Sequence, residues 1–399
     1  MSEQNNAGST RSTDYMEVKG FNVITAILPR HTSSEVADFI LDWPGRRLVA
    51  FNARGTLIRD RWYQALLPML SPEQEVYQFL IPQEDEEILM SQIIALGQLR
   101  LAGSGAVISM RTSRAIFSSG SPLWQNGALG FPRASGAIQL GRSLVGIYCT
   151  AQSRSAESIA RAAVRAGAHG PSISYSEGRG LRDRLGLLRI TQNPDKEFIR
   201  VIVDEFDAEP VFEAMVRAGR LDQPGRGFIY QIPVAKGLVN LATVSASGRH
   251  SASLQQVIHA IDDIKGGADW RLHHQLPGSS ERKSGFSFFG KEKSRRYLTN
   301  LQLLSCLAER KHAEALADAA LTAGSPGITT AFGKLIESGS EKTGAGVRLN
   351  RERVLIKMAI KADKVDGILH AMQKVATESR CTDHCFYVQE IPRALTFLG

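Results

Sequence analysis

An internal repeat constrains the fold of this chain more than any other feature of its sequence. Residues 155–173 and 312–330 match at eight positions with one constant offset of 157 residues. In the earlier segment the matching residues are Ala156, Glu157, Ala160, Ala162, Ala163, Ala166, Gly167 and Gly170. The same offset pairs Tyr230 with Tyr387, more than seventy residues further on. Such self-similarity indicates a duplicated structural unit.

A weaker third copy precedes these two. Residues 36–37 align with residues 159–160 at an offset of 123, and the Gly103-Ser104-Gly105 segment aligns with Gly225-Arg226-Gly227 at an offset of 122. The change of offset by one residue corresponds to a small insertion or deletion, which loops tolerate. The sequence therefore predicts three copies of one unit.

Each copy contains the same succession of patterns. In the second copy, apolar runs at 143–150, 198–203 and 228–232 are typical of strands, and residues 155–167 and 210–218 have helical spacing. With a short strand before the central loop, the order is β-α-β-β-α-β, the ferredoxin-like unit. The predicted fold class is therefore α+β, with three tandem ferredoxin-like domains. Because each antiparallel sheet would leave one apolar face uncovered, we expect the three sheets to pack together.

The predicted boundaries follow from these patterns and from the polar segments between them. Residues 1–15 are expected to be a disordered lead-in, and residues 118–139 and 251–297 are expected to be linkers, the second with an amphipathic helix and a basic stretch. The three domains are expected at 16–117, 140–250 and 298–399.

Charge and motifs restrict the function. No apolar run approaches the ~20 residues that span a bilayer, and the N-terminus lacks a signal-peptide core, so we expect a cytoplasmic protein. The net charge of +8 favours an anionic partner, such as nucleotide phosphates, nucleic acid or an acidic protein surface. Nucleic acid is disfavoured because no element combines clustered aromatic and basic residues. Since the chain has no nucleophile elbow, HExxH or paired-carboxylate motif, we expect no enzymatic activity and no required cofactor.

Three segments resemble the PII signalling proteins. Residues 225–234 (GRGFIYQIPV) are similar to the PII B-loop and the strand after it, and residues 170–182 (GPSISYSEGRGLR) to the strand that leads into the T-loop. In the first copy, residues 52–56 (NARGT) resemble the same T-loop segment of PII-like proteins. The resemblance is specific in the second copy, moderate in the first and mostly topological in the third.

The resemblance implies a regulatory protein. PII proteins are homotrimers with nucleotides in the clefts between subunits, so three PII-like domains in one chain imply an intrachain pseudo-trimer. The implied effector is an adenine nucleotide (ATP, ADP, AMP or cyclic AMP). The implied target is a protein such as a metabolic enzyme or a membrane transporter, for example one for inorganic carbon, which would place the protein at the inner face of the membrane. Residues 178–195 and 333–351 are the expected moving segments. The alternative is a ligand-free scaffold subunit of a larger complex.

The candidate ligand-binding residues are of two kinds. Gly-x-Gly turns can expose successive backbone N–H groups to a phosphate, and basic residues beside them can pair with its charge. The candidates are Arg54, Gly55, Thr56, Gly103, Gly105, Arg111, Gly178, Arg179, Gly180, Gly225, Arg226, Gly227, Lys236, Gly333 and Lys334. Arg114 is a further candidate by position. Residues 380–384 contain no glycine, so the third copy is predicted to have a degenerate B-loop.

The Cys381, His384 and Cys385 side chains have suggestive ligand types. A metal site needs about four ligands in fixed geometry, and no second Cys/His pair accompanies them, so we predict no metal site here. Cys385 aligns with Phe228 of the second copy and is expected to be a buried thiol. A regulatory disulfide between Cys381 and Cys385 is the alternative.

Overall fold

A computed structural model of the 399-residue chain describes residues 10–11, 15–41, 47–56, 73–101, 103–119, 140–141, 143–180, 195–241, 261, 264–265, 296–337 and 349–397. Most of the two predicted linkers and much of the two predicted moving segments lie outside these residues. Two short N-terminal strands, β1 (Thr10–Arg11) and β2 (Tyr15–Val18), pair with each other, so part of the predicted disordered lead-in is a strand.

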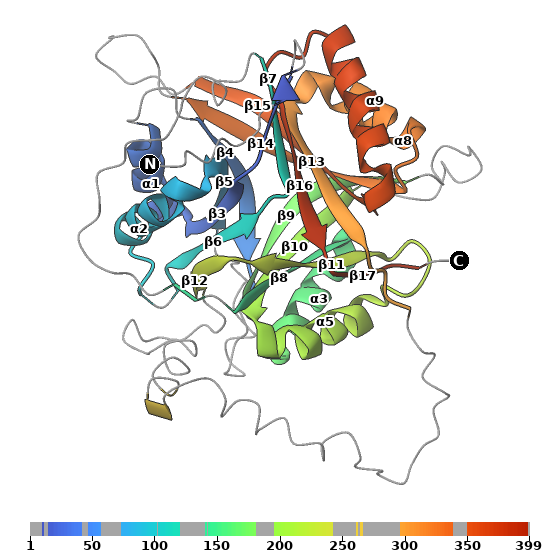
Figure 1. The fold of residues 1–399 in the computed structure, drawn as a ribbon. Helices are drawn as coiled ribbons and strands as arrows, with labels where there is room; N and C mark the ends of the chain where they lie inside the picture. The colour runs from blue at the N-terminus through green and yellow to red at the C-terminus, as the bar shows by residue number, and fades with distance from the viewer. Residues whose placement is uncertain are drawn as a thin grey trace, which may run out of the picture.

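One order of elements then recurs three times (Figure 1). The first repeat consists of β3 (Phe21–Pro29), α1 (Arg30–Leu41), β4 (Arg47–Gly55), β5 (Glu73–Pro82), α2 (Glu86–Leu96), β6 (Gly105–Arg111) and β7 (Arg114–Ser118). The second consists of β8 (Leu144–Gln152), α3 (Ser153–Arg165), β9 (His169–Gly180), β10 (Asp195–Asp204), α5 (Glu205–Gly219), β11 (Gly227–Val234) and β12 (Lys236–Asn240). The third consists of β13 (Leu301–Glu309), α8 (Ala313–Thr322), β14 (Gly327–Glu337), β15 (Leu349–Lys361), α9 (Val365–Glu378), β16 (Cys385–Ile391) and β17 (Arg393–Leu395).

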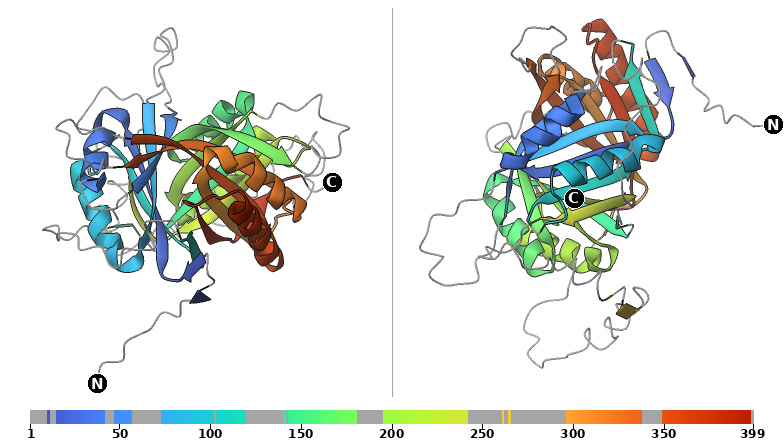
Figure 2. Two further views of the ribbon diagram at one scale, coloured as in Figure 1. Left: turned by 90° about the horizontal axis from the view of Figure 1, so that it is seen from above. Right: turned by 90° about the vertical axis from the view of Figure 1, so that its left-hand side faces the viewer.

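The predicted fold class of three small ferredoxin-like domains, packed as a pseudo-trimer, is wrong. The strands of all three repeats join into one 17-stranded sheet, which curls round on itself (Figure 2). Every repeat ends in a short strand that pairs with another repeat: β7 with β16, β12 with β6 and β17 with β11. The strands β4, β9 and β14 also pair with one another. Hydrogen-bonded ladders thus continue across the boundaries at which separate domains would end.

The hydrophobic core has a shared part and three local parts. The helix pairs α1/α2, α3/α5 and α8/α9 lie on the outside of the curled sheet (Figure 2), each over a cluster formed mainly by its own repeat. The largest cluster contains residues of all three repeats, including Val49, Tyr148 and Leu355. One continuous core of this kind stabilises the repeats jointly rather than one by one.

Local sequence signals set several element ends. Gly167 and Gly324 follow helices α3 and α8 with φ angles of +107° and +101°, as the predicted C-cap glycines require. Asp204 is the N-cap of α5, and its carboxylate accepts a hydrogen bond from the Phe206 N–H at 3.2 Å. Among the described residues, none of the helices is both long and apolar enough to cross a bilayer.

Candidate functional site at the repeat junctions

The two Gly-x-Gly turns have the same backbone geometry. Gly103 and Gly225 have φ angles of +82° and +69°, and Gly105 and Gly227 have +129° and +147°. A Cβ atom on Gly105 would lie 2.3 Å from the Ile27 carbonyl oxygen, and one on Gly227 would lie 2.2 Å from the Thr150 carbonyl oxygen. Close packing against β3 and β8 therefore explains why both turns require glycine, independently of any ligand.

The third repeat closes the equivalent turn differently. The Arg353 side chain, almost fully buried, forms an ion pair with Asp383 and donates a second hydrogen bond to the Asp383 carbonyl oxygen at 2.8 Å. A carboxylate and its arginine thus lie where the first two repeats have a Gly-x-Gly turn. That this loop is a degenerate B-loop stays a prediction.

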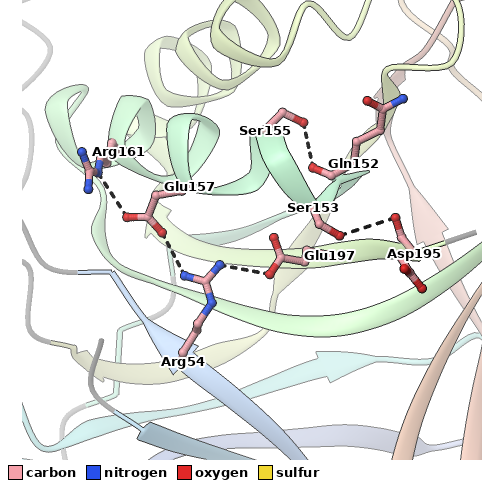
Figure 3. A network of polar contacts seen from close by, with 8 residues as sticks. All are labelled: Arg54, Gln152, Ser153, Ser155, Glu157, Arg161, Asp195 and Glu197. Carbon is pink, nitrogen blue, oxygen red and sulfur yellow. Dashed lines mark hydrogen bonds and ion pairs between the residues drawn. The ribbon is translucent and has the colours of Figure 1, made fainter. Parts of the chain in front are cut away.

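Arg54 ends β4 of the first repeat and binds carboxylates of the second (Figure 3). Its Nη1 lies 2.9 Å from Glu157 Oε2 on α3, and its Nη2 lies 3.0 Å from Glu197 Oε1 on β10. Burial lowers the pKa of Arg54, but the hydrogen bonds that its guanidinium donates to Glu157 and Glu197 outweigh burial, so that the arginine pKa is raised. The guanidinium is therefore already neutralised within the chain.

The two residues after Arg54 also contact the second repeat, through their backbones. Gly55 is paired with Ser172 of β9, and the Thr56 N–H donates to the Pro171 carbonyl oxygen at 3.1 Å. Thr56 is buried, and its hydroxyl has no hydrogen-bond partner among the described residues. The predicted T-loop segment of the first copy is thus an inter-repeat strand end.

Arg179 repeats this arrangement one repeat later. It lies between Gly178 and Gly180 at the end of β9, which pairs with the start of β14. Its guanidinium lies 3.4 Å from Glu314 Oε1 and 3.5 Å from Asp318 Oδ1 on α8. Glu314 is the residue that the offset of 157 aligns with Glu157. These side chains are more exposed than those around Arg54, so this contact contributes less to the stability of the fold.

A second set of ion pairs has threefold recurrence. Each short last strand carries a cation that binds an acid near the start of another repeat's second helix. Lys236 Nζ lies 2.7 Å from Glu87 Oε1 on α2, Arg114 pairs with Asp366 on α9, and Arg393 pairs with Glu209 on α5. Lys236 lies opposite Ser109, four residues along β6 from Gly105, so it does not approach the glycine turn.

Sequence reasoning did not identify Arg393 or any of the acids, although a signal was present. The offset of 122 aligns Arg114 with Lys236, and the offset of 157 aligns Lys236 with Arg393. The same two offsets align Glu87 with Glu209 and Glu209 with Asp366. The offsets therefore identify these cations and acids as recurring features, but they do not show which cation pairs with which acid.

Three of the predicted cationic residues form no ion pair with another described residue. Among the described residues, the side chains of Arg111, Arg226 and Lys334 have no hydrogen-bond or ion-pair partner. Arg111 and Lys334 are exposed, and Arg226 is half-buried. Gly333 packs against β4, where a Cβ atom would lie 2.8 Å from the Ala50 carbonyl oxygen.

One of these unpaired cations, Arg226, lies in a turn that adjoins the polar side chains around Arg54. Along the sheet, Glu197 is paired with Ala151, and Ala151 with Gly227. The Gln152 side chain donates to the Gly225 carbonyl oxygen at 3.2 Å, and Gln152 precedes the first residue of α3. We call the group formed by Arg54, Gln152, Glu157, Glu197 and the turn 225–227 the junction site; Figure 3 shows its four side chains outside the turn.

An aromatic side chain adjoins the junction site. Tyr175 lies directly opposite Glu197 on β9, and 50% of it is exposed. Its hydroxyl donates to Asp195 Oδ1 at 2.7 Å, which raises the tyrosine pKa to about 12. Tyr175 was not among the predicted site residues, because nothing in the sequence marks a single strand tyrosine as exposed.

The cysteines form a separate, buried group. All four are free and buried, which confirms the prediction of a buried thiol at Cys385. Burial raises the pKa of Cys381 to about 11 and that of Cys385 to about 12. In the described part of the chain no three His, Cys, Asp or Glu side chains gather as they would around a metal ion.

Comparison with known proteins identifies no family for this chain. No protein-family model matches the chain, and no curated protein matches its sequence. The similarity of its turns and strand ends to PII signalling proteins therefore stays a prediction.

Proposed function

We propose that the chain is a non-enzymatic regulatory protein that binds an anionic effector of the adenine-nucleotide class at the junction site and controls a protein partner. The observation that carries the proposal is that the Arg226 side chain has no partner among the described residues and lies in a turn whose two glycines both have positive φ angles. A guanidinium presents up to five N–H donors in a geometry that fits phosphate oxygens.

Two neighbouring features support binding at this place. Helix α3 begins at Ser153, and the free N–H groups of a helix N-terminus favour negative charge. The Tyr175 ring stacks on Phe332, with 6.2 Å between the ring centres, and its exposed half offers an apolar surface on which a base can stack. The partner is the protein target that the PII resemblance implies, and its identity stays a prediction.

Binding can be tested by titration calorimetry and thermal melts with ATP, ADP, AMP and cyclic AMP. An effector at 100 times its dissociation constant should add about 2.7 kcal/mol to the free energy of unfolding. Loss of a charge-assisted hydrogen bond is worth ~1.5–3 kcal/mol, so Arg226→Ala should weaken binding roughly tenfold or more. Arg165→Ala, at an exposed arginine of α3, is the matched control and should bind as the unmodified chain does. Equal affinity in Arg226→Ala and the control would contradict the proposal.

The alternative function is that of a ligand-free scaffold. The contacts that favour it are the intrachain ion pairs of Arg54, Arg179 and Lys236, because these cations were predicted to meet phosphates and instead join repeats. If none of the four nucleotides binds, the scaffold is the better account and the protein partner becomes the object of the search.

A further inference from the structure

Two cations lie inside the core that the three repeats share. Arg200 on β10 and Lys357 on β15 are 3% and 8% exposed. The Arg200 guanidinium carbon is 4.7 Å from the centre of the Phe198 ring, and Lys357 Nζ is 5.0 Å from the same ring centre. Lys357 Nζ is also 5.8 Å from the Tyr148 ring centre. The lysine of the third repeat therefore reaches into the second, beside a buried arginine.

No carboxylate neutralises these cations within the described residues. Arg200 donates to Ser174 Oγ at 2.8 Å through Nη1, but its Nε–H has no acceptor. The Tyr230 hydroxyl, next to Arg200, also has no hydrogen-bond partner in the described part of the chain. Buried charges in proteins are ordinarily paired, and buried polar groups ordinarily hydrogen-bonded.

Each of the three groups can donate a hydrogen bond. The Arg200 Nε–H, the Lys357 ammonium and the Tyr230 hydroxyl can each donate a hydrogen bond, and the first two carry positive charge. Aromatic rings and aliphatic strand residues surround them, including Phe198, Tyr148 and Leu355. Donors and positive charge together match an anion, and the buried side chains around them favour a small one.

We propose that Arg200, Lys357 and Tyr230 form a buried binding site for a small inorganic anion such as chloride. The site is separate from the junction site, since it lies in the shared core and uses none of the same side chains. The anion would screen the two cations from each other and accept the hydrogen bonds that they lack.

Protonation of Lys357 links this site to pH. Burial and the Arg200 charge lower the lysine pKa to about 7. The other titratable groups of the cluster keep one state between pH 6 and 9: burial raises the pKa values of Tyr148, Tyr230 and Tyr387, and the Arg200 pKa, lowered by burial, is about 10. Because an anion binds the ammonium form, stabilisation by chloride should be greatest below pH 7 and decline as the pH rises towards 9.

The first test compares thermal melts in sodium chloride and in sodium gluconate of equal ionic strength, since gluconate is a much larger anion than chloride. We expect the chain to melt at a higher temperature in chloride, by on the order of 2 °C for each tenfold rise above the dissociation constant. Lys357→Met replaces the ammonium by an apolar side chain of similar length and should abolish the difference. Lys361→Met, at an exposed lysine of the same strand, should retain it.

The second test needs no variant. Crystals grown with bromide in place of chloride should show an anomalous-scattering peak between Lys357 Nζ and Arg200 Nε. A chloride response that is equal in Lys357→Met and the unmodified chain would overturn the proposal. So would the lack of a bromide peak at this place, which would mean that Lys357 resides in the core as a neutral amine without an ion.

Discussion

The glycine at position 227 shows how closely single residues are fitted to the sheet. It has a φ of +147° and faces the Thr150 carbonyl oxygen across β8. Gly105 has the same relation to Ile27 in the first repeat. A residue that approaches a neighbouring carbonyl in this way has no room for a side chain, whatever the turn binds.

Gly227→Ala should therefore destabilise the protein. The new methyl group would meet the Thr150 oxygen at a φ that alanine rarely adopts, and we expect a loss of roughly 2–4 kcal/mol in the free energy of unfolding. Gly367→Ala is the control, because this glycine lies in α9 with no atom near its Cβ position; it should gain about 0.5–1 kcal/mol. Urea denaturation measures both. A loss below 1 kcal/mol in Gly227→Ala would show that the turn relaxes easily.

Among the elements, the short last strands and the strand ends are what join the repeats. Lys236, Arg114 and Arg393 each bring a cation from a short strand to an acid near the start of another repeat's second helix. Glu87 and Asp366 lie in the first turn, where a carboxylate also interacts favourably with the helix dipole. Arg54 and Arg179, at the ends of β4 and β9, pair with acids on the first helix of the next repeat.

A double-mutant cycle on Arg54 and Glu157 would measure one such contact. With Arg54→Met and Glu157→Gln, we expect a coupling of about 0.5–1 kcal/mol, because the pair is half-buried and hydrogen-bonded. The exposed pair Arg30–Glu73 within the first repeat is the comparison, and its coupling should be nearer zero. Equal coupling energies in the two cycles would mean that the inter-repeat position adds nothing.

Part of this element-level picture could be predicted from the sequence. The offsets of 122 and 157 correctly aligned the two Gly-x-Gly turns and the helices that carry Glu157 and Glu314, because sequence similarity survives where backbone geometry and packing are strict. The pairing of strands between repeats could not be predicted. Residues 393–395 form only a three-residue strand, and so short a segment has no periodicity that separates it from a loop. The ion pairs of Arg54, Arg179 and Lys236 could not be predicted for a related reason: a cation looks the same in sequence whether its partner is a ligand or a distant carboxylate.

On the scale of the whole molecule, the shared sheet and core make the repeats interdependent. Ile116 of β7 belongs to the cluster under α8 and α9, Leu238 of β12 packs against the cluster under α1 and α2, and Leu395 of β17 belongs to the cluster under α3 and α5. Each local core is thus completed by a residue from another repeat.

Leu395→Ala should consequently destabilise the second repeat, although the residue belongs to the third. Removing a buried leucine side chain costs ~2–5 kcal/mol, and hydrogen exchange should become faster in α3 and α5 as well as near β17. Leu101→Ala, at an exposed leucine, should leave exchange unchanged. Faster exchange confined to the third repeat would indicate that the repeats unfold independently.

Positions 78, 200 and 357 occupy the same place in the three repeats, opposite Thr25, Tyr148 and Ser305, yet they hold a glutamine, an arginine and a lysine. An assembly of three identical polypeptides has no such freedom, because one codon change alters all three copies together. A lone buried lysine would there become three, and their mutual repulsion would grow accordingly. Tandem duplication removes that constraint, so that the charge at the middle of the protein can evolve one residue at a time.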